Sequence, residues 1–296
     1  MATGDSPAGA RRRLRLEIRK AREATGRTQG QVAEALNWSL SKVNRIENGD
    51  VTISSTDLDA LLRLLGVSDS ALIERMAADA RAARKRGRGW WDEPRFREHV
   101  RPTTLQMLQF ESEASAIRAF NYAVIPGLLQ TREYAEAAIG NVTGDLSPEA
   151  RVVRTDLRML RQRKLRSRPD VQCLVILDEL LLQRTVGSAA VMAEQLRTLT
   201  DAARRANVVI RLLPRETSWP YIAIGTFILF DFDNVDSAVL YREFSLTDEI
   251  VHSADVVNAH RARFEQMWHS CLSEEASVAV IEAAHASLRA ALVRRG

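Results

Sequence analysis

The sequence predicts a mainly α-helical protein with a smaller α+β part, arranged as two domains. Its 296 residues exceed one typical domain and fall short of three. Residues 1–88 show mostly helical periodicity and contain 17 Lys and Arg against 11 Asp and Glu, a net charge of +6. The remaining residues contain strand-like runs and have a net charge of −2. A small basic domain therefore precedes a larger, nearly neutral one, and the first is expected to meet a polyanion.

The first two helices are predicted from periodicity and capping residues. Apolar residues recur at helical spacing over residues 13–25, and Gly26 can end that helix. Thr28 and Gln31 match a capping box, in which a threonine hydroxyl and a glutamine side chain satisfy free backbone amides. A second helix of about two turns is expected to follow.

A turn at Asn37 leads into the third predicted helix, because asparagine tolerates a positive φ. Ser39 is a good N-cap for residues 40–48, and Gly49 can end the helix. Two further helices are expected, one after Ser54 or Ser55 and one over residues 70–86. The N-terminal domain is thus predicted to hold five helices.

Two short helices at this separation within a basic helical domain indicate a helix-turn-helix. The characteristic residues are Thr28, Gln29, Val32, Ala33, Glu34, Leu36 and the run from Ser39 to Gly49. With these residues, the segment 14–67 resembles the XRE or Cro/C1 family of lambda-repressor-like domains. The resemblance implies that the protein binds double-stranded DNA.

The resemblance also implies roles for individual residues, with the third helix in the major groove and the start of the second on a phosphate. The implied DNA contacts are Gln29, Ser39, Leu40, Ser41, Lys42, Asn44 and Arg45. Arg45 can donate two hydrogen bonds to guanine, and Lys42 can reach the backbone. Leu40 departs from the family, which often has a polar base reader there; it could pack on a thymine methyl or leave the base unread. Arg22 and Glu47 fall on the positions of a structural salt bridge.

The C-terminal domain is expected to be α+β with about four strands. The predicted strands cover residues 171–177, 208–213, 226–232 and 238–242, and the predicted helices cover residues 105–120, 132–138, 148–167, 189–205, 253–272 and 273–293. A helix between the first two strands predicts one parallel crossover.

Domain boundaries follow from these patterns. The prediction is a disordered tail over residues 1–12, the helix-turn-helix domain over 13–86, a linker over 87–94 and the C-terminal domain over 95–296. The basic run 81–89 ends in glycines and is either a phosphate contact or a flexible hinge. Trp90 and Trp91 are expected to pack on the second domain, because adjacent indoles need a partner surface.

The C-terminal domain carries a second resemblance. The matching segments are Glu111 to Phe120, Ile125 to Thr131, Leu177 to Glu179 and Leu212 to Pro214. They resemble the C-terminal domain of WhiJ-like regulators of filamentous actinomycetes, some of which are described as antitoxin-like. The resemblance implies control of development or secondary metabolism, and a small protein partner encoded nearby.

No chemistry-bearing motif points to an enzyme, a cofactor or a metal. The five histidines lack metal-ligand spacing, and neither a nucleotide-phosphate loop nor a nucleophile elbow occurs. No apolar stretch reaches the roughly 18 residues of a membrane span. Cys173 and Cys271 are too few for a disulfide framework. A cytoplasmic, nucleoid-associated protein without a membrane partner is therefore expected.

Two further features leave alternatives open. Arg151, Arg154, Arg158 and Arg161 recur on one face of a predicted helix. This stripe is a solvated face with intramolecular pairs to acidic residues of the same domain, a surface for an acidic protein partner or a second DNA contact. The aromatic loop Trp219–Tyr221 either lines a pocket or packs at the edge of the core.

The sequence thus predicts a sequence-specific transcriptional regulator, modulated through its C-terminal domain. A homodimer on a palindromic operator is expected, because one short recognition helix reads only a few base pairs. The alternative is an antitoxin-like protein whose C-terminal domain sequesters a small partner, with DNA binding used for autoregulation.

Overall fold

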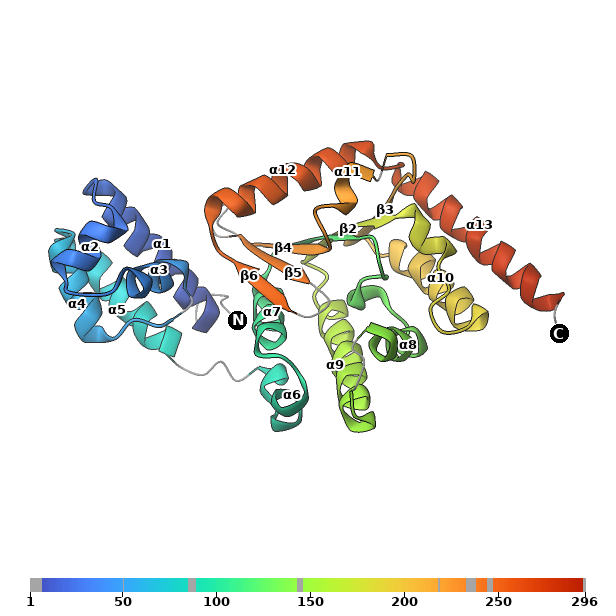
Figure 1. The fold of residues 1–296 in the computed structure, drawn as a ribbon, viewed down its shortest axis with the longest axis horizontal. Coiled ribbons are helices and arrows are strands. Elements are labelled where there is room, and N and C mark those ends of the chain that lie inside the picture. The colour runs from blue at the N-terminus through green and yellow to red at the C-terminus, as the bar shows by residue number, and fades with distance from the viewer. Residues whose placement is uncertain are drawn as a thin grey trace. The chain divides into compact units, whose positions relative to one another are not determined.

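The computed structural model describes residues 7–49, 51–84, 89–142, 146–217, 219–232, 238–243 and 247–294. The chain divides into two compact units, Met1–Gly89 and Trp90–Gly296 (Figure 1). The described part of the first unit contains helices alone, and the second combines helices with one sheet. This agrees with the predicted fold class.

The first unit is a bundle of helices around an apolar core. Its helices are α1 (Pro7–Ala24), α2 (Gln29–Ala35), α3 (Leu40–Asn48), α4 (Ser55–Leu64) and α5 (Ser70–Arg84). Thr28 and Gln31 form the predicted capping box of α2, and Ser39 caps α3. Gly49 ends α3 with a φ of 79°, and Asn37 has a φ of 52° in the turn before it. Local capping signals therefore locate both helices of the helix-turn-helix.

The first helix is longer than predicted. The expectation of a disordered tail through residue 12 is wrong, because α1 already begins at Pro7, a residue suited to the first turn of a helix. Ala10 is fully buried, and Nη2 of Arg11 donates to the carbonyl of Ala83 on α5 at 3.2 Å. Packing against α5 thus orders this stretch. Residues 1–6 lie outside the described part of the chain.

The predicted linker is only partly described. Residues 85–88, which hold most of the basic run, lie outside the described residues. The short helix η1 (Trp90–Asp92) and α6 (Pro94–His99) already belong to the second unit. The half-buried Trp90 and Trp91 meet edge to face with ring centroids 5.6 Å apart, and they line a hollow beside residues of α7 and α9.

One mixed sheet forms the centre of the second unit, with the strand order β3-β2-β1-β4-β5-β6. The strands are β1 (Ala116–Asn121), β2 (Gln172–Asp178), β3 (Val208–Leu213), β4 (Phe227–Asp231), β5 (Val239–Glu243) and β6 (Asp248–Val251). Strands β1, β2 and β3 are parallel, and the remaining pairs are antiparallel. The predicted crossover is confirmed, with α10 (Ala189–Ala203) joining β2 to β3.

Helices cover both faces of this sheet. On one face lies α12 (Ala254–Ser270), whose Phe264 joins an apolar cluster with Phe120 of β1. On the other lie α7 (Pro102–Glu113), α8 (Arg132–Val142) and α9 (Pro148–Arg166), as Figure 1 shows. Because successive strand residues point to opposite faces, Ala119 and Asn121 face away from α12.

Two strands depart from the prediction. β1 overlaps the end of the helix expected over residues 105–120, and β6 lies where no strand is predicted. The residues of β1 include Ala116, Arg118 and Ala119, which are good helix formers. Pairing with β2 on one side and β4 on the other overrides that local preference. β6 is a short strand at the sheet edge with little sequence signal.

The final helix, α13 (Glu274–Val293), packs on α10 and on the edge strand β3. The backbone amide of Leu212 in β3 donates to Oγ of the fully buried Ser277 at 3.0 Å. The carbonyl of Leu212 accepts from the amide of Leu272 at 2.9 Å. The junction between α12 and α13 therefore satisfies backbone groups that an edge strand would otherwise expose.

By length and composition alone, α13 could cross a membrane, and it is the only helix of the described residues that could. A single helix of this kind is weak evidence for a membrane protein. The absence of a membrane partner stays a prediction.

We expect Ser277→Ala to lower the free energy of unfolding by about 1–3 kcal/mol, because the buried amide of Leu212 loses its acceptor. Urea denaturation at equilibrium measures this change. Ser287→Ala is the matched control, since Ser287 is exposed on the same helix. Equal losses in the two variants would contradict the assigned role of Ser277.

Candidate DNA interface and an arginine-lined cavity

Helix α3 buries one side and presents the other to solvent. Val43 and Ile46 lie in the core of the first unit. On the outer side, Leu40 is 51% exposed. Ser41 and Arg45 are also exposed, and no side-chain partner engages either of them within the described residues. These three predicted DNA contacts are therefore available for recognition.

Three other predicted DNA contacts, Ser39, Lys42 and Asn44, are less free, because each is half-buried or contacts other residues of the protein. Nζ of Lys42 lies 3.1 Å from Oδ1 of Asp57 and 3.9 Å from the ring centroid of Trp38. The hydroxyl of Ser39 accepts from the backbone amide of Lys42 at 3.1 Å, and its own hydrogen can still be donated. Asn44 is half-buried. Lys42 can turn to a phosphate only by leaving Asp57.

The predicted pair of Arg22 and Glu47 lies behind α3. Glu47 is 6% exposed and accepts from Nε and Nη2 of Arg22 at 2.6 and 3.0 Å. The hydrogen bond to Glu47 raises the pKa of Arg22, although burial opposes the shift. Nε2 of Gln29 also donates to Glu47, at 2.8 Å. This leaves Gln29 one amide hydrogen for the phosphate contact that the sequence predicts.

The arginine stripe of α9 points largely inward. Arg151 is exposed, Arg154 and Arg158 are half-buried, and Arg161 is buried. Nε of Arg161 donates to both carboxylate oxygens of Glu111 on α7 at 2.8 Å. Burial lowers the pKa of Arg161, but the charge and hydrogen bonds of Glu111 outweigh it, and the net shift is upward.

For Arg161, the expected pairing with an acidic residue of the same domain is present, but it lies on a buried face, so Arg161 is part of neither a solvated face nor a protein-binding surface. The physical reason is that α9 packs with this face towards α7 and the sheet. Nε of Arg154 donates to the carbonyl of His99 at 2.8 Å, and Nη1 of Arg158 donates to Oε1 of Gln130 at 2.7 Å.

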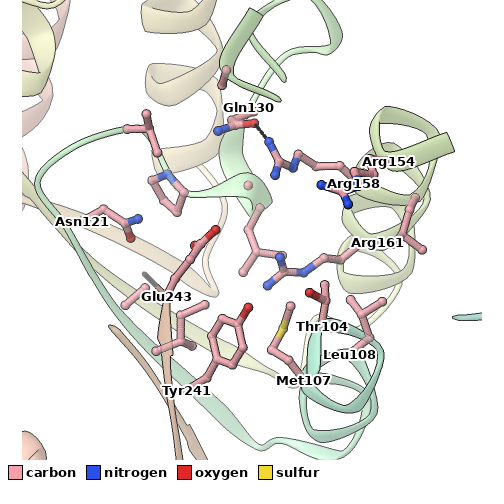
Figure 2. Close-up of a pocket in the computed structure, with 18 of the residues that line it drawn as sticks. Thr104, Met107, Leu108, Asn121, Gln130, Arg154, Arg158, Arg161, Tyr241 and Glu243 are labelled. Atoms are coloured by element: carbon pink, nitrogen blue, oxygen red, sulfur yellow. Dashed lines mark hydrogen bonds between the residues drawn. The ribbon is translucent and has the colours of Figure 1, made fainter. Parts of the chain in front are cut away.

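These three arginines reach a cavity of about 190 Å³ between α7, α9 and the sheet (Figure 2). Ala119, Val175, Ile228 and Tyr241 contribute strand side chains to it. Figure 2 shows Asn121 on the side opposite the arginines of α9, with Glu243 between them.

No sequence signal identifies the polar residues that meet the arginines in this cavity. Asn121 ends β1, where the sequence predicts a helix, and Glu243 is the last residue of β5 and belongs to no motif. Gln130 lies in a segment that carries the second resemblance, but nothing local assigns it a role. Residues from distant parts of the chain meet here, so no spacing signal exists for the set.

The aromatic loop Trp219–Tyr221 lies elsewhere. It belongs to the short helix α11 (Trp219–Ile222), and Tyr221 packs against the apolar cluster on the α12 face. Packing at the core edge is therefore the correct alternative for Tyr221. Among the described residues, no group of three or more His, Cys, Asp and Glu could hold a metal ion.

Two family models match the chain. One is described as a helix-turn-helix domain and covers residues 13–76. The other is described as a domain of unknown function, DUF5753, and covers residues 104–283, more than half of the chain. The chain belongs to the DUF5753 family. No curated protein and no solved structure matches it.

The first match confirms the helix-turn-helix that the sequence predicts, and with it a DNA-binding regulator. The helix-turn-helix also points to a non-enzymatic protein. The resemblance of the second unit to WhiJ-like regulators stays a prediction.

We expect Glu47→Ala to lower the free energy of unfolding of the first unit by about 1–3 kcal/mol, because the half-buried Arg22 keeps only the more distant Glu23 as a counter-ion and Gln29 loses its acceptor. Thermal and urea denaturation measure the loss. Glu34→Ala removes an exposed carboxylate from α2 and should be nearly neutral. A double variant, Arg22→Met with Glu47→Leu, should lose less than Glu47→Ala, because no unpaired charge remains. A Glu47→Ala variant as stable as Glu34→Ala would refute this role.

Proposed function

We propose that the protein is a sequence-specific transcriptional regulator that reads the major groove with α3. The observation that carries this proposal is the division of α3 into a buried side and a free side. Glu47 is fixed by Arg22 and Gln29, whereas Leu40 and Arg45 are exposed. A rigid helix with free side chains along one face is suited to base readout.

The free residues have complementary chemistry. Arg45 can donate two hydrogen bonds to O6 and N7 of a guanine, and Ser41 can pair with several bases. Leu40 can pack on a thymine methyl group. Backbone contacts come from Gln29 and Ser39, which each retain a donor hydrogen, and from Lys42 and Asn44. The net charge of +6 in residues 1–88 supplies attraction to phosphates.

We further propose that two copies of the chain bind a palindromic operator. A single short recognition helix reads only a few base pairs, so two half-sites separated by about one helical turn supply the missing specificity. The work of such a protein on DNA implies a cytoplasmic location, and we expect it with the nucleoid. The resemblance to WhiJ-like regulators supports development or secondary metabolism as the controlled process, with modulation through the second unit.

The test is a genome-wide DNA pull-down with the full chain and with Arg45→Ala, at about 50 and about 200 mM salt. The native protein should select discrete palindromic sites. Arg45→Ala should lose roughly 1–3 kcal/mol of discrimination at one position of each half-site, because the guanine contact is removed. Circular dichroism checks that the variant stays folded.

The matched control is Arg63→Ala, which removes one exposed arginine from α4. It should keep the operator preference of the native protein. Identical site preferences in all three proteins would overturn the reading by α3. Diffuse binding that disappears with salt would mean that the first unit only anchors the protein electrostatically.

A further inference from the structure

The cavity of the second unit has an unusual distribution of charge. Arg161 is matched by Glu111, and Nη1 of Arg101 lies 3.1 Å from Oδ1 of Asp248. For Arg154 and Arg158, no carboxylate of the described residues lies within ion-pairing distance. Each of these two guanidinium groups donates one hydrogen bond to a neutral oxygen. A guanidinium has five N–H donors, so most of their donors remain available.

Partial burial of the charged Arg154 and Arg158 side chains is unfavourable in free energy. It lowers the pKa of Arg158, with the negative charge of Glu243 opposing the shift, and it also lowers the pKa of Arg154, with the nearby Arg101 adding to the effect. A buried charge is normally paired, because leaving water without a partner is unfavourable. The two arginines are thus placed as binding groups for an anion.

A second polar group in the cavity also lacks a partner. Asn121 is 4% exposed, and its Oδ1 accepts no hydrogen bond from the described residues. Buried polar atoms are nearly always satisfied, so an orphaned acceptor that lines a cavity indicates a missing donor. Because an anionic ligand such as a carboxylate has no donor of its own, the donor would be a water held in the cavity beside the ligand.

The charge balance and the apolar walls of the cavity limit the class of ligand that fits. Four arginines meet three carboxylates, Glu111, Glu243 and Asp248, which leaves one positive charge uncompensated. The remaining walls are largely apolar, with Met107, Leu108, Ile125 and Leu157 among them. A closed cavity of about 150 Å³ holds one benzene ring, so the volume here suits a slightly larger molecule.

We propose that the cavity binds a small amphipathic carboxylate. The carboxylate pairs with Arg154 and Arg158, and the apolar body lies against Met107, Leu108 and Ile125. Planar guanidinium groups pair well with carboxylates through two parallel hydrogen bonds. A phosphate dianion carries two negative charges, whereas the cavity has one uncompensated positive charge. Phosphate also has no apolar part that could contact the apolar walls. This inference goes beyond the proposed function, because it requires no DNA.

The test is calorimetric titration of the full-length protein with octanoate and phenylacetate. Octanamide and phenylacetamide provide the same apolar bodies without charge, and inorganic phosphate provides charge without an apolar body. We expect both carboxylates to bind with dissociation constants below about 1 mM, and the amides and phosphate to bind at least about tenfold more weakly.

Three variants separate recognition from general charge effects. Arg158→Gln should weaken both carboxylates by about tenfold or more, because a charged hydrogen-bonding partner is lost. Arg163→Gln removes an exposed arginine from the same helix, outside the cavity, and should leave binding unchanged. Arg158→Met should abolish carboxylate binding while the ligand-free protein melts at the same or a higher temperature, because a half-buried cation without a carboxylate in ion-pairing distance is removed.

Several results would overturn the proposal. Absence of carboxylate binding at about 10 mM would exclude the ligand class. Equal binding of amides and carboxylates, or equal losses in Arg158→Gln and Arg163→Gln, would show that the two arginines do not select the anion. Preferential binding of phosphate would assign the cavity to a different anion. A large drop in melting temperature for Arg158→Met would make Arg158 a structural cation.

Discussion

The hydrogen bonds of the buried Glu47 carboxylate to Arg22 and Gln29 are the interaction on which the position of α3 depends. Glu47 lies on α3 and accepts hydrogen bonds from Arg22 of α1 and Gln29 of α2, so one group connects three helices. Because these polar groups satisfy one another behind α3, the opposite side of the helix needs no internal partner. Leu40 and Arg45 can therefore remain exposed without destabilising the bundle.

The second unit also contains arginines at a packed helix face, one with a carboxylate partner and one without. Arg161 and Arg158 are three residues apart on α9, and both point towards the cavity. Arg161 has Glu111 as its counter-ion, which ties α9 to α7. Arg158 has only the neutral oxygen of Gln130 at 2.7 Å. The Arg161–Glu111 pair connects the two helices that border the cavity, and Arg158 is the group that we propose for binding an anion there.

Sequence signals predicted the first unit well because they are local. The capping box at Thr28 and the left-handed Gly49 act within one turn of the helices that they limit. The start of α1 was missed because its order comes from contact with α5, as the hydrogen bond from Arg11 to Ala83 illustrates. In the second unit, the sequence predicts the strands rich in β-branched residues, whereas it predicts a helix where β1 lies. Its alanines favour a helix locally, and only its two neighbouring strands make it extended.

The sequence by itself determined the helix-turn-helix and the fact that Arg154, Arg158 and Arg161 share one helix face. Helical periodicity states which residues lie together, but it does not state what that face packs against. The tertiary structure decided that this face turns towards α7 and the sheet. It also decided that Asn121 and Glu243 meet these arginines across a cavity, because strand pairing and helix packing bring together residues that no local spacing connects.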